Sequence, residues 1–361
     1  MHGVGTKTDT MKNSGSILRI SMGKLQKLWT AYRLRQKRRR LLFRAIRKRR
    51  QLKSVICRTD QFSDDAILLF STVRNEKLRL PYFLDYYRKL GVCHFLMVDN
   101  NSDDGTAEYL ATQPDVSLWS TTHSYKLSRF GVDWLTWLQI KYGHDHWCLT
   151  VDADEILVYP FCDTRPLPEL TDWLDKNAIP AFGAVMLDMY PKTALDQQVY
   201  QAAQNPFQIL EWFDADNIRW QMQEKLQNLW VQGGVRERVF FANRPERAPT
   251  LNKTPLVKWN RRFSYVTSTH SLLPRKLNHV FDMQDGQKLT GALLHSKFLH
   301  IIADKSVEEK QRKEHFANSL LYDDYYDNLA TSPVLWCKTS VKYTGWQQLL
   351  DLKLLSKGNW Q

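Results

Sequence analysis

An apolar run that ends abruptly in carboxylates constrains this chain more than any other stretch. Cys148–Val151 is short, hydrophobic and rich in strand-forming residues, so it predicts a buried parallel strand. Asp152, Asp154 and Glu155 follow directly. Ligands bind open α/β sheets at the carboxyl ends of strands, where residues two apart point the same way. Asp152 and Asp154 are therefore candidates to share one Mn²⁺ or Mg²⁺ ion, because both ions prefer oxygen ligands. The alternative is that these are loop carboxylates capping the next helix.

Strands and helices are expected to alternate on both sides of this run. Spacing of this kind indicates βαβ units and a parallel sheet. The predicted fold class is therefore α/β, with a Rossmann-like, mostly parallel sheet flanked by helices. The expected strands are 66–72, 94–98, 116–120, 148–152 and 181–189, and the expected helices are 79–90, 106–112, 130–142 and 168–177.

The later part of the chain is harder to assign from its pattern. We expect an insertion containing helix at 191–230, a strand at Val235–Phe241 and another at Leu293–Ile302. Two C-terminal helices are predicted, at about 304–330 and 341–355. The expected division is a basic arm at 1–56, a main domain at 64–303 and a helical extension at 304–361.

Positive charge is concentrated at the N-terminus. The net charge is +13, and residues 1–53 hold 17 of the 51 Lys and Arg with one of the 38 acidic residues, which leaves the remainder at −3. Apolar residues recur with helical spacing among the basic ones from about Ile17 to Ile56. Such a basic amphipathic helix favours an anionic membrane surface, with a nucleic-acid arm as the alternative. We expect residues 17–56 to bind the membrane and expect no nucleic-acid partner.

Several features bear on the compartment. The five cysteines are scattered and include no Cys-x-x-Cys pair, which indicates free thiols in a reducing environment. No apolar stretch reaches the ~18–20 residues needed to span a bilayer, and Met1–Gly15 lacks the order of a signal peptide. We expect a cytoplasmic protein, peripheral on the inner face of the plasma membrane.

Three polar motifs follow expected strands in a fixed order. They are Ser71-Thr-Val-Arg-Asn-Glu76, Val98-Asp-Asn-Asn-Ser-Asp-Asp-Gly-Thr106 and Val151-Asp-Ala-Asp-Glu155. In this order they resemble family 2-like glycosyltransferases of the GT-A fold, most closely bacterial enzymes of the Asp-Ala-Asp-Glu type. The resemblance covers residues 66–160, is looser to about 303, and is absent from 1–60 and the C-terminal extension.

The resemblance implies an activity and its partners. It implies metal-dependent, inverting transfer of a sugar from a nucleoside-diphosphate donor, with UDP as the expected nucleotide, to a surface-glycan or lipid-linked acceptor. It also implies site residues near the strand ends. The expected nucleotide-sugar-binding residues are Thr72, Asn75, Glu76, Asp99, Asn100, Asn101, Arg129, Asp152 and Lys297, and the expected metal ligands are Asp152, Asp154 and His295.

Some of these residues have a second interpretation. Residues 101–105 also fit a helix N-cap and turn, and Arg129 also fits a surface helix cap. A lone histidine is often structural, and His270 and His300 compete with His295 for the expected role. Lys253 and Lys258 are expected to be solvated.

The catalytic base is the least determined residue. An inverting enzyme needs a carboxylate that removes the proton of the acceptor hydroxyl. The Glu-Asp pair that the family usually carries downstream is not evident in this chain. Asp188, at the end of an expected strand, and Glu237, between Arg236 and Arg238, are the candidates, and Asp188 is preferred. An ion pair with either arginine is the alternative for Glu237.

Two other functions are compatible with parts of the sequence. The arm and globule together suit a protein that binds an acidic polymer such as RNA, although the globule itself is slightly acidic. A metal-dependent hydrolase of a diphosphate bond would use the same fold and the same carboxylates. Product analysis separates hydrolysis from sugar transfer.

Overall fold

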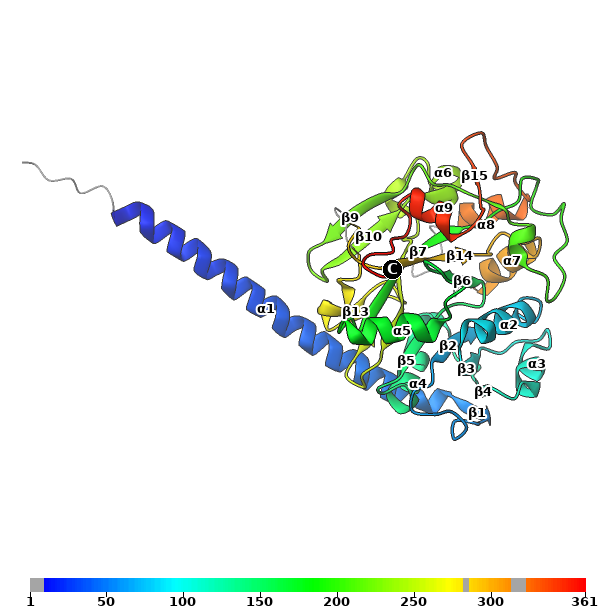
Figure 1. Ribbon diagram of the computed structural model, residues 1–361, viewed down its shortest axis with the longest axis horizontal. Coiled ribbons are helices and arrows are strands. Elements are labelled where there is room, and N and C mark those ends of the chain that lie inside the picture. The colour runs from blue at the N-terminus through cyan, green and yellow to red at the C-terminus, as the bar shows by residue number, and fades with distance from the viewer. Residues whose placement is uncertain (1–9, 282–285, 313–322) are drawn as a thin grey trace, which may run out of the picture.

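A nine-stranded sheet runs through the centre of the protein. The computed structural model describes residues 10–281, 286–312 and 323–361, with side chains described from Leu25 onward in the first helix (Figure 1). The strand order across the sheet is β1 (Lys53–Ile56), β4 (Val116–Ser120), β3 (His94–Asp99), β2 (Leu68–Val73), β5 (Trp147–Thr150), β11 (Asn252–Lys258), β7 (Ala181–Asp188), β14 (Thr290–His295) and β6 (Glu155–Val158).

Most of these strands run in one direction. β4, β3, β2 and β5 are mutually parallel, and β14 is parallel to β7. β11 is antiparallel to both β5 and β7 and therefore joins the two parallel groups. β1 and β6 form antiparallel edges. The expected α/β fold, a mostly parallel sheet flanked by helices, is confirmed.

The helices cover both faces of the sheet. Residues of α2 (Leu80–Leu90), α3 (Thr106–Thr112) and α5 (Leu167–Lys176) pack with one set of sheet residues, and residues of α4 (Val132–Tyr142) pack with the other set. Strands covered on both faces are apolar without alternation. β3 and β7 are buried at every position.

Local sequence signals explain α2. Its buried residues recur at helical spacing along one face, and a proline occupies its first turn. Gly91 ends the helix with φ 104°, a left-handed conformation that glycine adopts without steric cost. The expected helix at 79–90 is confirmed. So are the expected strands at 66–72, 94–98, 116–120, 148–152 and 181–189, to within a few residues at each end.

The N-terminal arm is one long helix, α1 (Thr10–Lys48), which extends away from the globule (Figure 1). Its C-terminal part packs on α4. The helix ends before Ile56, so the expectation of helix to that residue is wrong for 53–56, which form edge strand β1 against β4. No helix among the described residues is long and apolar enough to cross a membrane.

The chain departs from expectation in two further regions. Val235–Phe241 was expected to be a strand but lies in helix α6 (Gly234–Phe240), because a run this short fits both periods. Residues 191–230 contain no α-helix. They form a 3₁₀ turn at Pro206–Gln208 and the strands β8 (Trp212–Phe213), β9 (Arg219–Gln223) and, continuing to residue 232, β10 (Asn228–Gln232).

The C-terminal part is also more divided than expected. The strand predicted at 293–302 corresponds to β14, which ends at His295. The helix predicted at 304–330 includes residues 313–322, which lie outside the described residues. The division into arm, domain and extension stays a prediction. The remaining elements are β12 (Ser264–Tyr265), β13 (Leu272–Leu273), α7 (Ile302–Arg312), α8 (Asp323–Ala330), β15 (Val341–Lys342) and α9 (Trp346–Asp351).

Candidate active site

The acidic loop lies at the carboxyl end of β5, as its sequence predicted. The Asp152 side chain is 52% exposed, and its Oδ2 lies 3.3 Å from the Lys253 ammonium. Glu155 is buried, and its Oε1 lies 2.7 Å from the same ammonium. Burial alone disfavours a charged lysine, but the Glu155 and Asp152 carboxylates raise the pKa of Lys253 above its ordinary value. Lys253 is therefore a buried cation that holds the acidic loop.

Lys253 corrects a sequence expectation. It was expected to be solvated, yet its side chain is 5% exposed, on the central strand β11. Lys258, at the end of the same strand, is 38% exposed and lies 3.1 Å from Asp175, so the expectation holds in part for it. The two lysines differ because β11 carries only Lys253 to the buried side of the acidic loop.

His295 joins two carboxylates at the end of β14. Its Nδ1 lies 2.6 Å from Asp188 Oδ1, and its Nε2 lies 3.1 Å from Asp154 Oδ2. Arg236 Nε donates to the other Asp188 oxygen at 2.7 Å. Burial disfavours the imidazolium, but the Asp154 charge and the hydrogen bonds to both carboxylates raise the pKa of His295 to about 9. The raised pKa favours the imidazolium form, which has one N–H for each of the two carboxylates.

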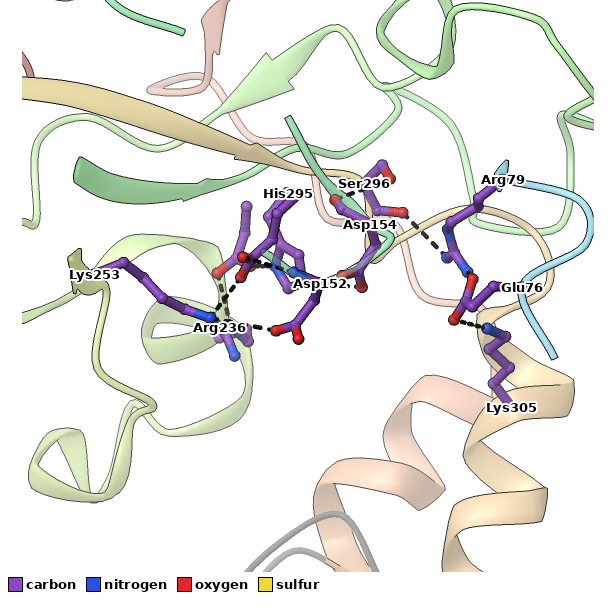
Figure 2. Close-up of polar contacts among 11 residues, drawn as sticks. Glu76, Arg79, Asp152, Asp154, Arg236, Lys253, His295, Ser296 and Lys305 are labelled. Carbon is purple, nitrogen blue, oxygen red and sulfur yellow. Dashed lines mark hydrogen bonds and ion pairs between the residues drawn. The ribbon is translucent and has the colours of Figure 1, made fainter. Parts of the chain in front are cut away.

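Nearby cations lower the pKa values of both Asp188 and Asp154. Burial opposes the charged form of Asp188, but Arg236 and His295 lower its pKa to about 2. Burial likewise opposes the charged form of Asp154, and His295 and Arg79 nevertheless hold its pKa well below the ordinary value. Both groups are carboxylates at neutral pH, so charges alternate along this chain of contacts (Figure 2).

A second chain of polar contacts holds the far side of the acidic loop. The Asp154 carbonyl accepts from the Ser296 amide at 2.7 Å and from its hydroxyl at 3.1 Å. Arg79 Nη2 donates to the Ser296 carbonyl at 3.3 Å, and Arg79 Nη1 lies 2.8 Å from Glu76. Glu76 also pairs with Lys305 of α7 (Figure 2). The C-terminal helix α7 is thereby tied to the loop after β2.

These groups line a cleft of about 900 Å³. The cleft begins at the carboxyl ends of β2, β3 and β5 and continues past β14 to α7 and the segment around residues 246–250. Several predicted residues from different elements meet in it. The expected site residues that line the cleft are Thr72, Glu76, Asn100, Arg129, Asp152, Asp154, His295 and Lys297.

Three predicted nucleotide contacts lie outside the cleft lining. Asp99 accepts from the Ser102 amide at 3.2 Å, and Asn75 Oδ1 accepts from the Asp103 amide at 3.0 Å. Asn101 is exposed in a left-handed conformation with φ 60°. Asp99 and Asn75 thus hold the loop after β3, and the left-handed Asn101 fits the turn alternative for residues 101–105. Nucleotide binding by these three residues stays a prediction.

The two expected catalytic bases also lie outside the lining. Asp188 is 1% exposed and bound by His295 and Arg236. Glu237, on α6, accepts hydrogen bonds from Arg219 on both of its carboxylate oxygens. It therefore forms an ion pair with an arginine, as the alternative stated, but the partner is Arg219 and not Arg236 or Arg238. Both carboxylates are engaged in ion pairs in this arrangement, and the role of either as catalytic base stays a prediction.

The end of the cleft formed by the segments after β2 and before α4 contains polar atoms without partners among the described residues. Thr72 Oγ1 and Arg129 Nη2 are buried and have no hydrogen-bond partner among the described residues. Arg129 is otherwise fixed, because its Nε lies 2.7 Å from Asp133 and its Nη1 donates to the Tyr265 carbonyl at 2.8 Å. Buried donors without partners are costly, so these two groups point to a ligand that hydrogen-bonds with them.

The candidate metal ligands fit a divalent cation unequally. Asp152 and Asp154 offer carboxylate oxygens toward the cleft, which suit Mg²⁺ or Mn²⁺ together with donor phosphates. His295 Nε2 lies 3.1 Å from Asp154 Oδ2, and a nitrogen of this ring would have to release its proton before binding a metal, so its role as a ligand stays a prediction. Within the described residues no group of three or more His, Cys, Asp or Glu forms a ready-made metal site.

The sequence analysis assigned no site role to four cationic residues: Arg79, Arg236, Lys253 and Lys305. Arg79 directly precedes α2 and Lys305 lies in α7, and the sequence around neither shows that they meet Ser296 and Glu76, which are distant along the chain. A signal existed for Lys253, because it interrupts a strand-like run at Asn252–Lys258. A charged residue inside a central strand requires a buried partner.

Comparison with known proteins does not place the chain in a family. No family model matches it, and no curated protein matches it. Solved structures with partial similarity include a mannosyltransferase from Pyrobaculum calidifontis in complex with GDP-Man and Mn²⁺, at 18% identity and a TM-score of 0.27, covering 44% of this chain and 46% of that one. The chain thus spans less than half the length of that enzyme.

Two further similar structures cover more of both chains. A putative glucose-1-phosphate thymidylyltransferase from Bacillus anthracis has 8% identity and a TM-score of 0.28, covering 74% of this chain and 82% of that one. A mannose-1-phosphate geranyltransferase from Thermus thermophilus has 11% identity and a TM-score of 0.25, with coverage of 74% and 68%. At such values the similarity identifies no activity for this chain.

Proposed function

We propose that this protein is a glycosyltransferase that binds a nucleoside-diphosphate sugar, with UDP as the expected nucleotide, in the cleft at the carboxyl ends of β2, β3 and β5. The observation that carries the proposal is the pairing of an Asp-x-Asp loop with buried hydrogen-bond donors that lack partners. Asp152 and Asp154 face the same cleft as Thr72 Oγ1 and Arg129 Nη2. The diphosphate of a nucleotide sugar would lie near the two carboxylates, and its nucleoside would hydrogen-bond with the two unpartnered groups.

The nucleotide would occupy the end formed by the β2, β3 and α4 segments. Thr72 offers a hydroxyl there, and Arg129 offers one N–H of a guanidinium that Asp133 and the Tyr265 carbonyl already orient. The Asn100 amide nitrogen is occupied by the Thr121 and His123 carbonyls, both at 3.0 Å. Its carbonyl oxygen is the group left to accept from the base.

The diphosphate would lie across the acidic loop. Lys297 lines the cleft and makes no hydrogen bond or ion pair with any residue the structure describes, and burial lowers its pKa. A phosphate beside it would restore the favourable surroundings of its charge. A divalent cation bound by Asp152 and Asp154 supplies Lewis-acid stabilisation of the departing diphosphate.

The remaining residues keep these groups in place. Lys253 fixes Asp152 and Glu155, and protonated His295 fixes Asp154 against Asp188. The geometry favours a positioning role for Asp188 over the role of catalytic base, since its oxygens already accept from His295 and Arg236. Glu237 is equally engaged by Arg219. The proposed acceptor, a glycan or lipid-linked sugar, would enter from the end lined by Trp230 and Glu246.

A donor-binding and transfer assay tests the proposal. Thermal shift with a panel of nucleotide sugars and Mn²⁺ should show a rise in melting temperature for one nucleotide class, since a ligand of the native state stabilises it. Transfer or slow donor hydrolysis should then fall at least a hundredfold in Asp152→Asn and Asp154→Asn. Asp145→Asn, at an 83% exposed side chain, is the matched control.

The outcomes separate the alternatives. Activity retained in both aspartate variants would refute the metal role. Release of nucleoside monophosphate with an intact sugar phosphate would indicate diphosphate hydrolysis instead. Absence of any nucleotide-dependent shift, with or without Mn²⁺, would refute donor binding in the cleft.

A further inference from the structure

Helix α1 exposes large apolar side chains that belong to none of the hydrophobic clusters formed by the described residues. Six of them are between 37% and 68% exposed. Helices of globular proteins normally bury such residues on a partner, and contiguous exposed ones mark an interaction surface. We define this set as the outward stripe of α1: Leu25, Leu28, Trp29, Tyr32, Phe43 and Ile46.

By helical position the outward stripe lies opposite the buried side of α1, and Trp29 and Tyr32 also border an open hollow shared with Lys225 of the globule. Leu34 and Ala45 are buried, and Leu34 packs with Val266 and Leu273. At about 100° per residue these two positions define the inner side of the helix, and the stripe residues fall roughly on the opposite side. The globule therefore leaves the stripe residues exposed while α1 packs on α4.

Exposed arginines border the stripe along its length. Arg33 and Arg40 fall on one side of it by helical position, and Arg35 falls on the other. Arg39 interrupts it between Tyr32 and Phe43. The arm as a whole carries all of the excess positive charge of the chain, since residues beyond 53 sum to −3.

The combination of apolar and cationic side chains selects the partner. An RNA strand would use the arginines but has no use for exposed leucine and isoleucine side chains. An anionic bilayer surface uses both, because lipid headgroups attract the arginines while the apolar side chains enter the boundary of the acyl chains. Trp29 and Tyr32, whose rings stack with centroids 5.6 Å apart, are the residue types that concentrate at such boundaries.

We propose that α1 lies flat on an anionic lipid bilayer, with the outward stripe inserted at the interface and the bordering arginines against the headgroups. The globule then sits above the surface, held by the inner side of the same helix. This inference goes beyond the chemistry proposed for the cleft and does not depend on it. It specifies which face of the expected membrane-binding segment makes the contact.

Vesicle co-sedimentation of the full-length protein tests the proposal. Binding to vesicles with about a third of phosphatidylserine should exceed binding to pure phosphatidylcholine vesicles at least tenfold, and should weaken with salt. The triple variant Leu25→Gln, Leu28→Gln, Trp29→Gln keeps every charge and should lose at least tenfold of the binding to anionic vesicles. Val199→Gln, at a 69% exposed apolar residue of the globule, is the matched control and should bind as the native protein does.

Each other result overturns the proposal. Equal binding by the native and triple-variant proteins would show that the stripe does not insert. A native dimer in analytical ultracentrifugation that the triple variant loses, without vesicle binding, would assign the stripe to a second copy. Tighter binding to single-stranded RNA than to anionic vesicles, unchanged in the triple variant, would assign the arm to a polyanion. The circular dichroism of the triple variant should match that of the native protein because the three side chains are exposed.

Discussion

His295 Nδ1 lies 2.6 Å from Asp188 Oδ1 in the buried wall of the cleft. The contact connects two strands that lie side by side, since His295 and Asp188 are paired positions of β14 and β7. Through the other nitrogen of the imidazole it extends to Asp154 of the acidic loop. The position of the loop carboxylate therefore depends on a residue that does not itself reach the cleft.

Asp188→Asn should destabilise the protein strongly. The substitution removes the negative charge between His295 and Arg236 and leaves two buried cations facing each other. Removing one partner of a buried ion pair typically costs about 3–5 kcal/mol. Urea denaturation should show a loss of about 3 kcal/mol in unfolding free energy, whereas Asp175→Asn, at a half-exposed site, should change it by less than about 1 kcal/mol. Equal effects would show that the buried pair contributes no more than a surface one.

Lys253→Met should also destabilise the protein, and a second substitution should partly reverse the effect. Without the ammonium, Glu155 stays buried with no cation, at a cost of about 3 kcal/mol. Adding Glu155→Gln removes the unpaired charge and should recover at least about 1 kcal/mol. Lys258→Met, on the same strand but 38% exposed, is the control and should cost less than about 1 kcal/mol. A double variant less stable than Lys253→Met would contradict the pairing.

His94 should make the fold sensitive to mild acid. Burial lowers its pKa to about 4, and its Nε2 lies 2.8 Å from the Ser117 hydroxyl. The unfolded state takes up a proton near pH 6.5 whereas the folded state does not, so stability should be full above that pH and fall as the pH drops toward 4. Between pH 7 and pH 5 the native protein should lose about 1–2 kcal/mol from this residue. His94→Gln should remove that part of the slope, and an unchanged slope would exclude this histidine as its source.

Only the C-terminal part of the arm should contribute to the thermal stability of the globule. Removing residues 1–31 takes away no buried side chain among those that the structure describes, which begin at Leu25, and should leave the melting temperature unchanged. Removing residues 1–53 also removes buried Leu34 and Ala45 and the 2.5 Å contact of Arg44 with Asp133. Because Asp133 also holds Arg129, the larger truncation should lower both the melting temperature and nucleotide binding. Identical melting curves for the two truncated proteins would contradict the packing of α1.

The sequence predicted those parts of the site whose signals are local. Asp152 and Asp154 follow an apolar run directly, and strand periodicity placed Thr72 and Asn100 at neighbouring strand ends. The sequence does not show whether a polar side chain hydrogen-bonds within its own loop or with a ligand. Asp99 and Asn75 satisfy their own loop, and a donor list drawn from motifs does not show this.

Distance along the chain explains the other failures. Lys253 looks like a surface residue until β11 is placed beside β5, which no local pattern indicates. Arg236 meets Asp188 only because Val235–Phe241 forms a helix, whereas its alternation suggested a strand. The arm was recognisable as amphipathic, but the side of α1 that the globule covers follows only from Leu34 and Ala45 in the folded protein.

The position of β11 in the middle of the sheet has a consequence for the newly made chain. β5 pairs with β2 on one side and with β11 on the other, so its second edge stays open until residues 151–251 have been synthesised and β11 has emerged. An open edge beside an apolar strand is a template for pairing with other chains. Nascent protein on the ribosome therefore carries an unprotected strand edge for the time needed to translate that interval, and release at that stage should yield aggregates instead of a smaller folded unit.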